Sequence, residues 1–227
     1  MQPWEIIDRA QAPDGAELQL ARRGDEWVVR AAGRVLMSSR MHGSEEALAA
    51  LALARATERG RVTRAVLVGG LGLGFTLRAV LDRLPDDARA IVVELVPALA
   101  EWNRGPLADL AGRPLDDPRA RLQHGDVLAR IAEAERAYDA ILLDVDNGPS
   151  ALAHRANARL YAPKGLRACH RALKPGGVLA VWSAGPDERF LERLSAAGLE
   201  PEERSVPGRS GTSKGVRHVV FLGTRRG

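Results

Sequence analysis

The sequence of 227 residues contains one cysteine, Cys169, so an internal disulfide or a multi-cysteine metal site is excluded. Histidine is also scarce, with five residues, and none forms an H-E-x-x-H or Cys/His cluster, so we predict no metal site. No apolar run reaches the roughly 18 residues that a membrane helix needs. Residues 1–8 lack the basic and apolar regions of a signal peptide. We therefore expect a cytoplasmic protein with no membrane partner, in which Cys169 packs in the core.

Aromatic residues and lysines are few as well. Aromatic side chains make up 4% of the chain, and the formal charge of +4 comes almost entirely from arginines that are interleaved with acidic residues. A nucleic-acid interface would show a basic stripe with interspersed aromatic residues, which this pattern lacks. The composition therefore favours a solvated arginine surface and a small-molecule substrate, with no nucleic-acid partner.

The phosphate-loop motif G-x-x-x-x-G-K-[ST] is absent, but another glycine-rich turn is present. An apolar strand at 65–69 leads into Gly70, Gly72 and Gly74, and a helical pattern follows. A dinucleotide fingerprint G-x-G-x-x-G would need glycine at Phe75. The observed G-x-G-x-G spacing is the usual form in S-adenosylmethionine (SAM) enzymes. A nucleoside without phosphates therefore fits better than NAD or ATP.

Acidic residues follow the predicted strands in step with this turn. Glu94 closes one strand, Gly125-Asp126 follows the next, and Asp144 follows another. Glycines alone are compatible with a plain tight turn. A glycine turn followed by acids at successive strand ends is, however, how an open α/β sheet holds a nucleoside. Glu94 has the oxygens to accept from a ribose diol, and Asp126 can accept from an adenine amine.

The periodicity predicts an α/β fold with a doubly wound, mostly parallel seven-stranded sheet behind a small N-terminal antiparallel β unit. We assign residues 1–43 to that unit and 44–227 to a Rossmann-like domain. The unit contains strands at 17–21, 27–31 and 35–38. A helix then runs from Ser44, as N-cap, to Arg59, with Glu45 and Glu46 in its first turn.

From Val62 onward, strands and helices alternate. We expect parallel strands at 65–69, 90–94, 120–123, 139–143 and 177–182, and helices near 75–84, 97–103, 127–135, 157–173 and 187–197. The last two strands, 200–205 and 217–223, are expected to form an antiparallel hairpin at the sheet edge. Their polar link, 206–215, is interpreted as a surface loop, with a lid as the alternative.

Taken together, these motifs resemble the spermidine synthase family within the class I SAM-dependent methyltransferase fold. The resemblance covers most of the chain. It is carried by the front β unit and by the segments 39–48, 68–78, 93–94, 125–126, 138–149 and 173–179. It implies that Gly70, Gly72 and Gly74 line a donor, SAM or decarboxylated SAM, that Glu94 binds its ribose, and that Asp126 contacts its adenine. We add the flanking residues Leu71, Leu95, Gly125 and Val127 to the predicted donor site.

The resemblance also implies that Asp144 is the catalytic acid beside the attacking amine and that it contacts the donor. The sequence departs from the family nearby. The family has an aspartate in the glycine turn that holds the aminopropyl ammonium, and we align Leu73 with it. The family's second acid appears as Asn147, with Asp146 beside it. A leucine cannot pair with a cation, so these changes weaken the case for a standard spermidine synthase.

Three functions follow from this pattern. The first is methyl transfer from SAM to a small amine, hydroxyl or carboxyl acceptor, with Asp144 as the proton acceptor and His42, Glu46, Asp146 and Asn147 around the acceptor. The second is aminopropyl transfer from decarboxylated SAM to a polyamine-like amine, in a negative pocket supplied by Asp144, Asp146, Glu45 and Glu46. The third is a SAM- or nucleoside-binding protein without catalysis. By analogy with the family, the chain is expected to form a homodimer.

Overall fold

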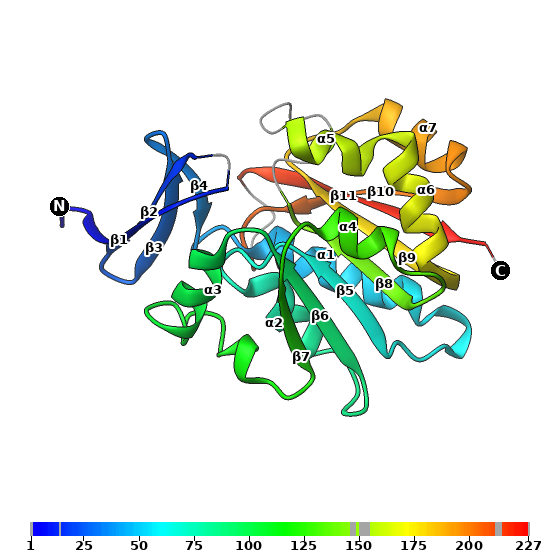
Figure 1. Cartoon of the computed structure of the whole chain (residues 1–227), viewed down its shortest axis with the longest axis horizontal. Coiled ribbons are helices and arrows are strands. Elements are labelled where there is room, and N and C mark those ends of the chain that lie inside the picture. The colour runs from blue at the N-terminus through cyan, green and yellow to red at the C-terminus, as the bar shows by residue number, and fades with distance from the viewer. Residues whose placement is uncertain (1, 14, 146–148, 150–154, 212–214, 227) are drawn as a thin grey trace.

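The computed structural model describes residues 2–13, 15–145, 149, 155–211 and 215–226, and it contains a small sheet and a large one (Figure 1). The small sheet is antiparallel with the order β1-β2-β3-β4. Three of its strands match predicted ones. The first, β1, was not predicted. Their bounds are β1 Glu5–Gln11, β2 Glu17–Arg23, β3 Glu26–Ala31 and β4 Arg34–Ser38.

The small sheet packs against α3 (Pro97–Arg104) through a separate apolar core. Leu18, Leu20 and Val29 of the sheet meet Leu99 and Trp102 of the helix. The Trp102 indole Nε1 also donates to Asp8 Oδ2 of β1 over 2.7 Å. Leu73 of the glycine turn belongs to the same core, so the turn and the small sheet are packed together. The division at residue 43 stays a proposal.

The large sheet has seven strands in the order β10-β11-β9-β8-β5-β6-β7. Strand β11 pairs antiparallel with both β9 and β10, and the other neighbours pair in parallel. The predicted doubly wound, mostly parallel sheet with an antiparallel edge hairpin is thus confirmed. The strands are β5 Ala65–Gly69, β6 Arg89–Glu94, β7 Ala120–His124, β8 Tyr138–Leu143, β9 Leu173–Ser183, β10 Leu199–Pro207 and β11 Arg217–Arg225.

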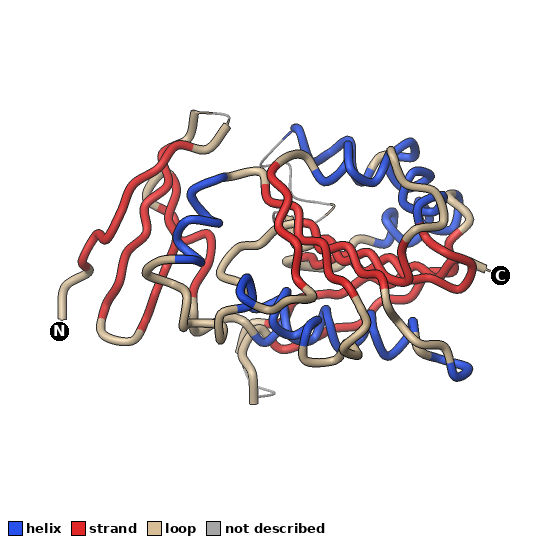
Figure 2. The backbone as a smooth tube through the Cα atoms, turned by 60° about the horizontal axis from the view of Figure 1, so that its bottom comes forward, coloured by secondary structure: helices blue, strands red, loops and turns tan. Residues whose placement is uncertain are grey.

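Helices cover both faces of the large sheet (Figure 2). On one face, α1 (Gly43–Ala56) and α2 (Phe75–Leu81) share a core with Val66 and Val68 of β5. On the other face, the alternate residue Leu67 belongs to a second core with four other helices. Apolar side chains on both faces explain why these strands read as continuous hydrophobic runs. The second layer contains α4 Val127–Ala132, α5 Arg155–Tyr161, α6 Pro163–Ala172 and α7 Glu188–Ala196.

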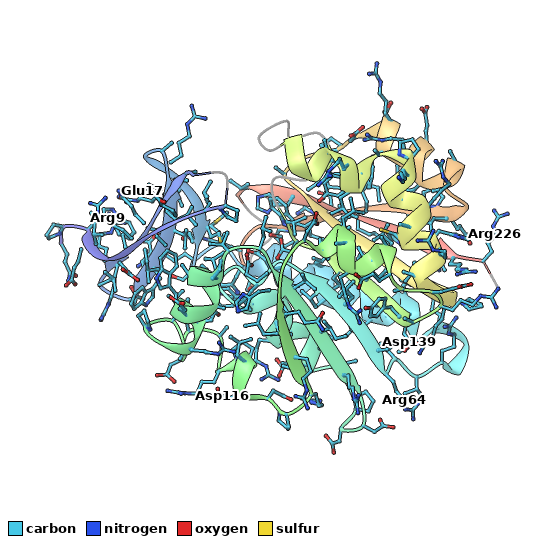
Figure 3. The ribbon with its side chains drawn as sticks, in the orientation of Figure 1. Arg9, Glu17, Arg64, Asp116, Asp139 and Arg226 are labelled. Carbon is cyan, nitrogen blue, oxygen red and sulfur yellow. The ribbon has the colours of Figure 1, made fainter. Side chains whose placement is uncertain are left out.

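Hydrogen bonds join the first residues of β5 and β8 at the end of the large sheet that lies away from the small sheet. In Figure 3, Arg64 and Asp139 lie at that end, whereas Arg9 and Glu17 lie on the small sheet. Asp139 Oδ2 accepts hydrogen bonds from the backbone N–H groups of Arg64 and Ala65, at 3.0 and 2.9 Å, and from Lys174 Nζ at 2.9 Å. These bonds hold β5 and β8 side by side at their starts, which leaves their carboxyl ends for a site.

Three local predictions were wrong. The expected helix 157–173 is divided, because Pro163 occupies the first turn of a new helix, α6, where its missing N–H costs nothing. Ser44 is not an N-cap: His42 precedes α1, and Ser44 is fully buried inside the first turn. The strand predicted over 177–182 begins earlier, because β9 starts at Leu173. Within the described residues, no helix is long and apolar enough to cross a membrane.

Candidate active site

The site forms where the strand order reverses, between β5 and β8. Chain connections leave in opposite directions at such a point, and ligands of open α/β sheets bind outside the carboxyl ends there. The glycine turn follows β5, and Asp144 follows β8 directly. The Asp144 N–H donates to the Gly69 carbonyl over 2.9 Å, so the two strand ends lie against each other.

The glycines of the turn have different reasons to be glycine. Gly70 has φ 88°, and a Cβ added there would lie 2.4 Å from the Asp144 carbonyl oxygen. Gly74 has φ 89°, and its Cβ would lie 2.8 Å from Asn103 Oδ1. Close packing and the positive φ thus require glycine at both positions. At Gly125 (φ 144°) a Cβ would meet nothing within 4 Å, so this backbone borders open space at the predicted donor site.

Glu94 fastens the turn, a role that sequence reasoning did not anticipate. Its Oε2 accepts from the Leu71 N–H and its Oε1 from the Val96 N–H, each over 2.8 Å. The side chain is buried, with 5% of its surface exposed. Each carboxylate oxygen can accept a second hydrogen bond, so the predicted bonds to ribose hydroxyls remain compatible with these two.

Asn103 of α3 supports the same turn from the other side, and it was missed in the sequence. Its Nδ2 donates to the carbonyls of Gly72 and Leu99, at 2.9 and 2.8 Å. Asn103 is almost fully buried. Because a buried amide is costly to leave unpaired, these bonds fix the path of the turn. The burial of Asn103 depends on how α3 packs, so the sequence alone does not distinguish it from an exposed helix residue.

The predicted adenine side contains an exposed acid and an exposed leucine. Asp126 caps α4, with its Oδ1 accepting from the Leu128 N–H over 2.8 Å. Its other oxygen lies 3.6 Å from Arg159 at the surface. Leu95 exposes 48% of its surface, whereas Val127 and Leu71 are buried and support the backbone. An apolar face beside an exposed carboxylate fits a purine with its amine, so the residues present fit a nucleoside donor.

Asp144 is oriented by Thr76, a residue that sequence reasoning also missed. The Thr76 hydroxyl, buried in the first turn of α2, donates to Asp144 Oδ2 over 2.6 Å. Burial raises the pKa of Asp144 to about 6, and this hydrogen bond opposes the rise. An acid with a raised pKa at the carboxyl end of a strand is a candidate proton acceptor.

Of the two acids in the first turn of α1, Glu45 is the one that the charge of Asp144 affects. Burial, and then the nearby carboxylate of Asp144, raises the pKa of Glu45 above its ordinary value. The Ser44 hydroxyl donates to Glu45 Oε2 over 2.7 Å, and Ser44 Oγ also hydrogen-bonds His218 Nδ1 of β11 over 2.8 Å. The His218 ring contacts Trp182 edge to face at 4.7 Å, which packs this group against the sheet.

Glu46 and His42 form a contact with the link between β10 and β11. His42 Nδ1 lies 2.9 Å from Glu46 Oε1, and the Ser210 hydroxyl donates to Glu46 Oε2 over 2.6 Å. The His42 ring stacks on Phe75 with centroids 4.1 Å apart. His42 therefore borders the glycine turn, whereas Glu46 holds the link. An open cavity of about 370 Å³ lies here, lined by Ser39, Arg40, His42, Arg209 and Ser210.

Two predicted acceptor residues, Asp146 and Asn147, lie outside the described residues. Leu73, by contrast, is described and buried in the core beneath the small sheet. From Gly69 to Gly74 the turn contains no acidic residue.

A family model for the spermine/spermidine synthase domain matches residues 41–193, which include the glycine turn, Glu45 and Asp144. The chain belongs to the spermine/spermidine synthase family. The match leaves out the small sheet and the β10–β11 hairpin, so His218 and the link lie outside the part that the family model covers.

Individual relatives agree with this membership in the family. A polyamine aminopropyltransferase of Nitrosomonas europaea is 34% identical over 146 residues, covering 63% of this chain and 42% of the relative. Polyamine aminopropyltransferase 1 of Streptomyces coelicolor is 36% identical over 123 residues, covering 53% of this chain and 22% of the relative. The chain thus spans less than half the length of these spermine/spermidine synthase relatives.

The fold of the family extends over almost the whole chain. The crystal structure of spermidine synthase from Thermotoga maritima superposes with a TM-score of 0.76 at 20% identity, covering 97% of this chain and 72% of that one. The small N-terminal sheet and the large sheet therefore both belong to the spermidine synthase fold.

Proposed function

We propose that this protein transfers an aminopropyl group from decarboxylated SAM to a primary amine. The observation that carries the proposal is Asp144, held by Thr76 at the switch point beside a glycine turn that Glu94 fastens. The matches to polyamine aminopropyltransferases support this reaction over the methyl transfer that the sequence first favoured. A sulfonium donor supplies an activated carbon, so the protein's task is to align and deprotonate the acceptor.

The residues divide this task between them. Gly125, Leu95 and Asp126 offer the surface for the adenine, and Glu94 offers its remaining lone pairs to the ribose. Asp144 accepts a proton from the acceptor ammonium, which makes the amine nucleophilic. Its raised pKa places this step near neutral pH, because the group must be ionised to accept the proton. Homodimer formation stays a prediction.

Methyl transfer from SAM remains a second candidate because of one observation. The turn has no acid, and Leu73 is buried in an apolar core, so the turn offers no carboxylate to an aminopropyl ammonium. A methyl donor has no such ammonium on the transferred group and needs no partner there.

Analysis of the reaction products distinguishes aminopropyl transfer, methyl transfer and binding without catalysis. Purified protein is incubated with decarboxylated SAM and a series of diamines, and separately with SAM and the same acceptors. We expect methylthioadenosine to form from decarboxylated SAM only when an amine is present. If SAM yields S-adenosylhomocysteine and decarboxylated SAM yields no product, the reaction is methyl transfer instead. Donor binding without either product would support a protein that binds without catalysis.

The Asp144→Asn variant tests the proposed proton acceptor. We expect turnover to fall by about a hundredfold or more, the range that a positioned acid or base contributes. The affinity for methylthioadenosine, measured by calorimetry, should change little because the adenosine contacts remain. Unchanged turnover in this variant would remove Asp144 from the reaction.

A further inference from the structure

The first turn of α1 supplies a second acid to this site. We propose that Glu45 and Asp144 together form the cation subsite, and that Glu45 pairs with the ammonium of the acceptor amine. This inference rests on the proposed function, because it assigns the acceptor side of the same site. It makes Glu45 the residue that selects a cationic acceptor, in place of an acid that the glycine turn lacks.

The packing of α1 determines where Glu45 points. The helix lies against β8, β9 and β11, with its buried residues Leu48, Ala52 and Leu53 in the core. Successive residues of a helix differ by about 100° in direction. Ser44 is fully buried and bonds His218 of β11, and Glu46 accepts from Ser210 of the β10–β11 link. The Glu45 carboxyl lies close enough to Asp144, which directly follows β8, to be affected by its charge.

A polar chain fixes the Glu45 carboxyl in this direction. The Ser44 hydroxyl donates its hydrogen to Glu45 Oε2 over 2.7 Å, and Ser44 Oγ lies 2.8 Å from His218 Nδ1. Because the Ser44 hydrogen is used for Glu45, His218 Nδ1 must carry a proton and donate it to Ser44 Oγ. Burial lowers the pKa of His218, so this imidazole is neutral at neutral pH and supplies a donor, not a charge. The hydrogen bonds through Ser44 and His218 therefore orient the Glu45 carboxyl without supplying a positive charge to it.

The two carboxyls face each other without a cation. The charged groups that act on Glu45 are Asp144 and Glu46, which are both acidic. Among the residues that the structure describes, no lysine, arginine or histidine side chain bonds to Glu45 or Asp144. Both residues are only partly buried, so a ligand can reach them. A desolvated carboxylate without a countercharge is costly, and it keeps a proton or takes a cation.

The protonation of this pair gives the inference a measurable consequence. We expect the pair to hold a proton in the free protein at neutral pH, because burial raises the pKa of both acids and the Asp144 carboxylate raises that of Glu45 further. An ammonium ion placed between them supplies the missing positive charge, so the pair loses its proton when the amine binds. Binding of a cationic acceptor is therefore coupled to proton release.

The bound ammonium gives one proton to the ionised pair and becomes a neutral amine. Its nitrogen lone pair forms the new N–C bond as the C–S bond breaks, and the electron pair of that bond stays on sulfur as a thioether. The product is a secondary ammonium, which carries the positive charge that the sulfonium lost. The pair keeps one proton, as in the free protein.

Calorimetry with putrescine as the probe tests the inference without requiring turnover. Putrescine is titrated into protein saturated with methylthioadenosine at neutral pH, in two buffers with different ionisation enthalpies. The wild type should release up to one proton per putrescine bound. Glu45→Gln should bind at least tenfold more weakly and release no proton, and Glu45→Asp should keep part of both effects. Glu58→Gln, which changes an exposed acid beyond the other end of α1, is the matched control and should behave as the wild type.

Two outcomes would overturn the inference. One is a wild type that does not bind putrescine, and the other is a Glu45→Gln variant with unchanged affinity and proton release. Circular dichroism establishes that each variant is folded. A failure here is distinct from a failure of the proposed function, because the product assay with Asp144→Asn measures transfer and this titration measures only recognition of the cation.

Discussion

Thr76 connects the glycine turn to Asp144 through a single hydroxyl. Its hydrogen bond of 2.6 Å stabilises the ionised carboxylate, so its removal should raise the pKa of Asp144 further. In Thr76→Val we expect turnover to fall about tenfold, consistent with the loss of a hydrogen bond to a charged group. The acidic limb of the pH–rate profile should move to higher pH.

Thr76→Ser restores the hydroxyl and should recover both the rate and the profile. A Thr76→Val variant that lost turnover with no displacement of its pH–rate profile would give Thr76 a purely structural role.

The distinction between Glu45 and Glu46 shows, at this scale, what sequence reasoning can and cannot find. The sequence indicates that both acids lie in the first turn of a helix, and the structure confirms this. It does not indicate which of them faces the sheet, because the rotation of α1 depends on Ser44, His218 and the last strand, far along the chain. Asp144 was identified because it directly follows an apolar strand, a signal that is local.

At the scale of elements, the glycine turn is held by two neighbours, β6 through Glu94 and α3 through Asn103. Gly74→Ala places a Cβ 2.8 Å from Asn103 Oδ1 at a position with φ 89°. Gly33→Ala has a similar φ of 74° with nothing within 4 Å, so it reports the cost of the backbone conformation alone, about 1–2 kcal/mol. We expect Gly74→Ala to be more destabilising than Gly33→Ala in urea denaturation and to weaken methylthioadenosine binding.

Equal losses of stability in the two variants would mean that the Asn103 contact yields easily. In that case Asn103 would not be the residue that fixes the turn, and the binding of methylthioadenosine should be unaffected.

The predicted elements succeeded where periodicity is strong and failed where it is weak. Strands β5, β6 and β8 are largely buried, so their apolar runs identified them within a residue or two. Strand β1 was missed because most of its residues are exposed at a sheet edge and show no clear alternation. The helix predicted over 157–173 has continuous amphipathic spacing, and only Pro163 marks the division that the structure shows.

At the scale of the whole molecule, the acid pair makes stability depend on pH in an unusual direction. A carboxyl whose pKa is raised on folding binds its proton more tightly in the folded state, so stability falls as pH rises. For Glu45 the fall should extend from its ordinary pKa of 4.5 to about 8. Urea denaturation across this range should show a smaller decline for Glu45→Gln than for the wild type, and Glu58→Gln should keep the wild-type slope.

A Glu45→Gln protein with the same pH dependence as the wild type would mean that Glu45 titrates normally in the folded state. Asp117 provides a contrast in the same molecule. Its hydrogen bonds with Arg119 lower its pKa to about 2, so its contribution is present above its unfolded value and is lost only in strong acid. The decline in stability expected between pH 4.5 and about 8 is therefore separate from ordinary acid denaturation.

The bond between His218 and Ser44 joins residues 174 positions apart in the chain. During synthesis on the ribosome, the glycine turn, Glu94 and Asp144 emerge long before β11 does. A nascent chain can therefore assemble its nucleoside cradle while the residue that orients Glu45 has not yet been made. Recognition of the amine would then follow nucleoside binding during synthesis, because it is completed only when β11 inserts beside β9.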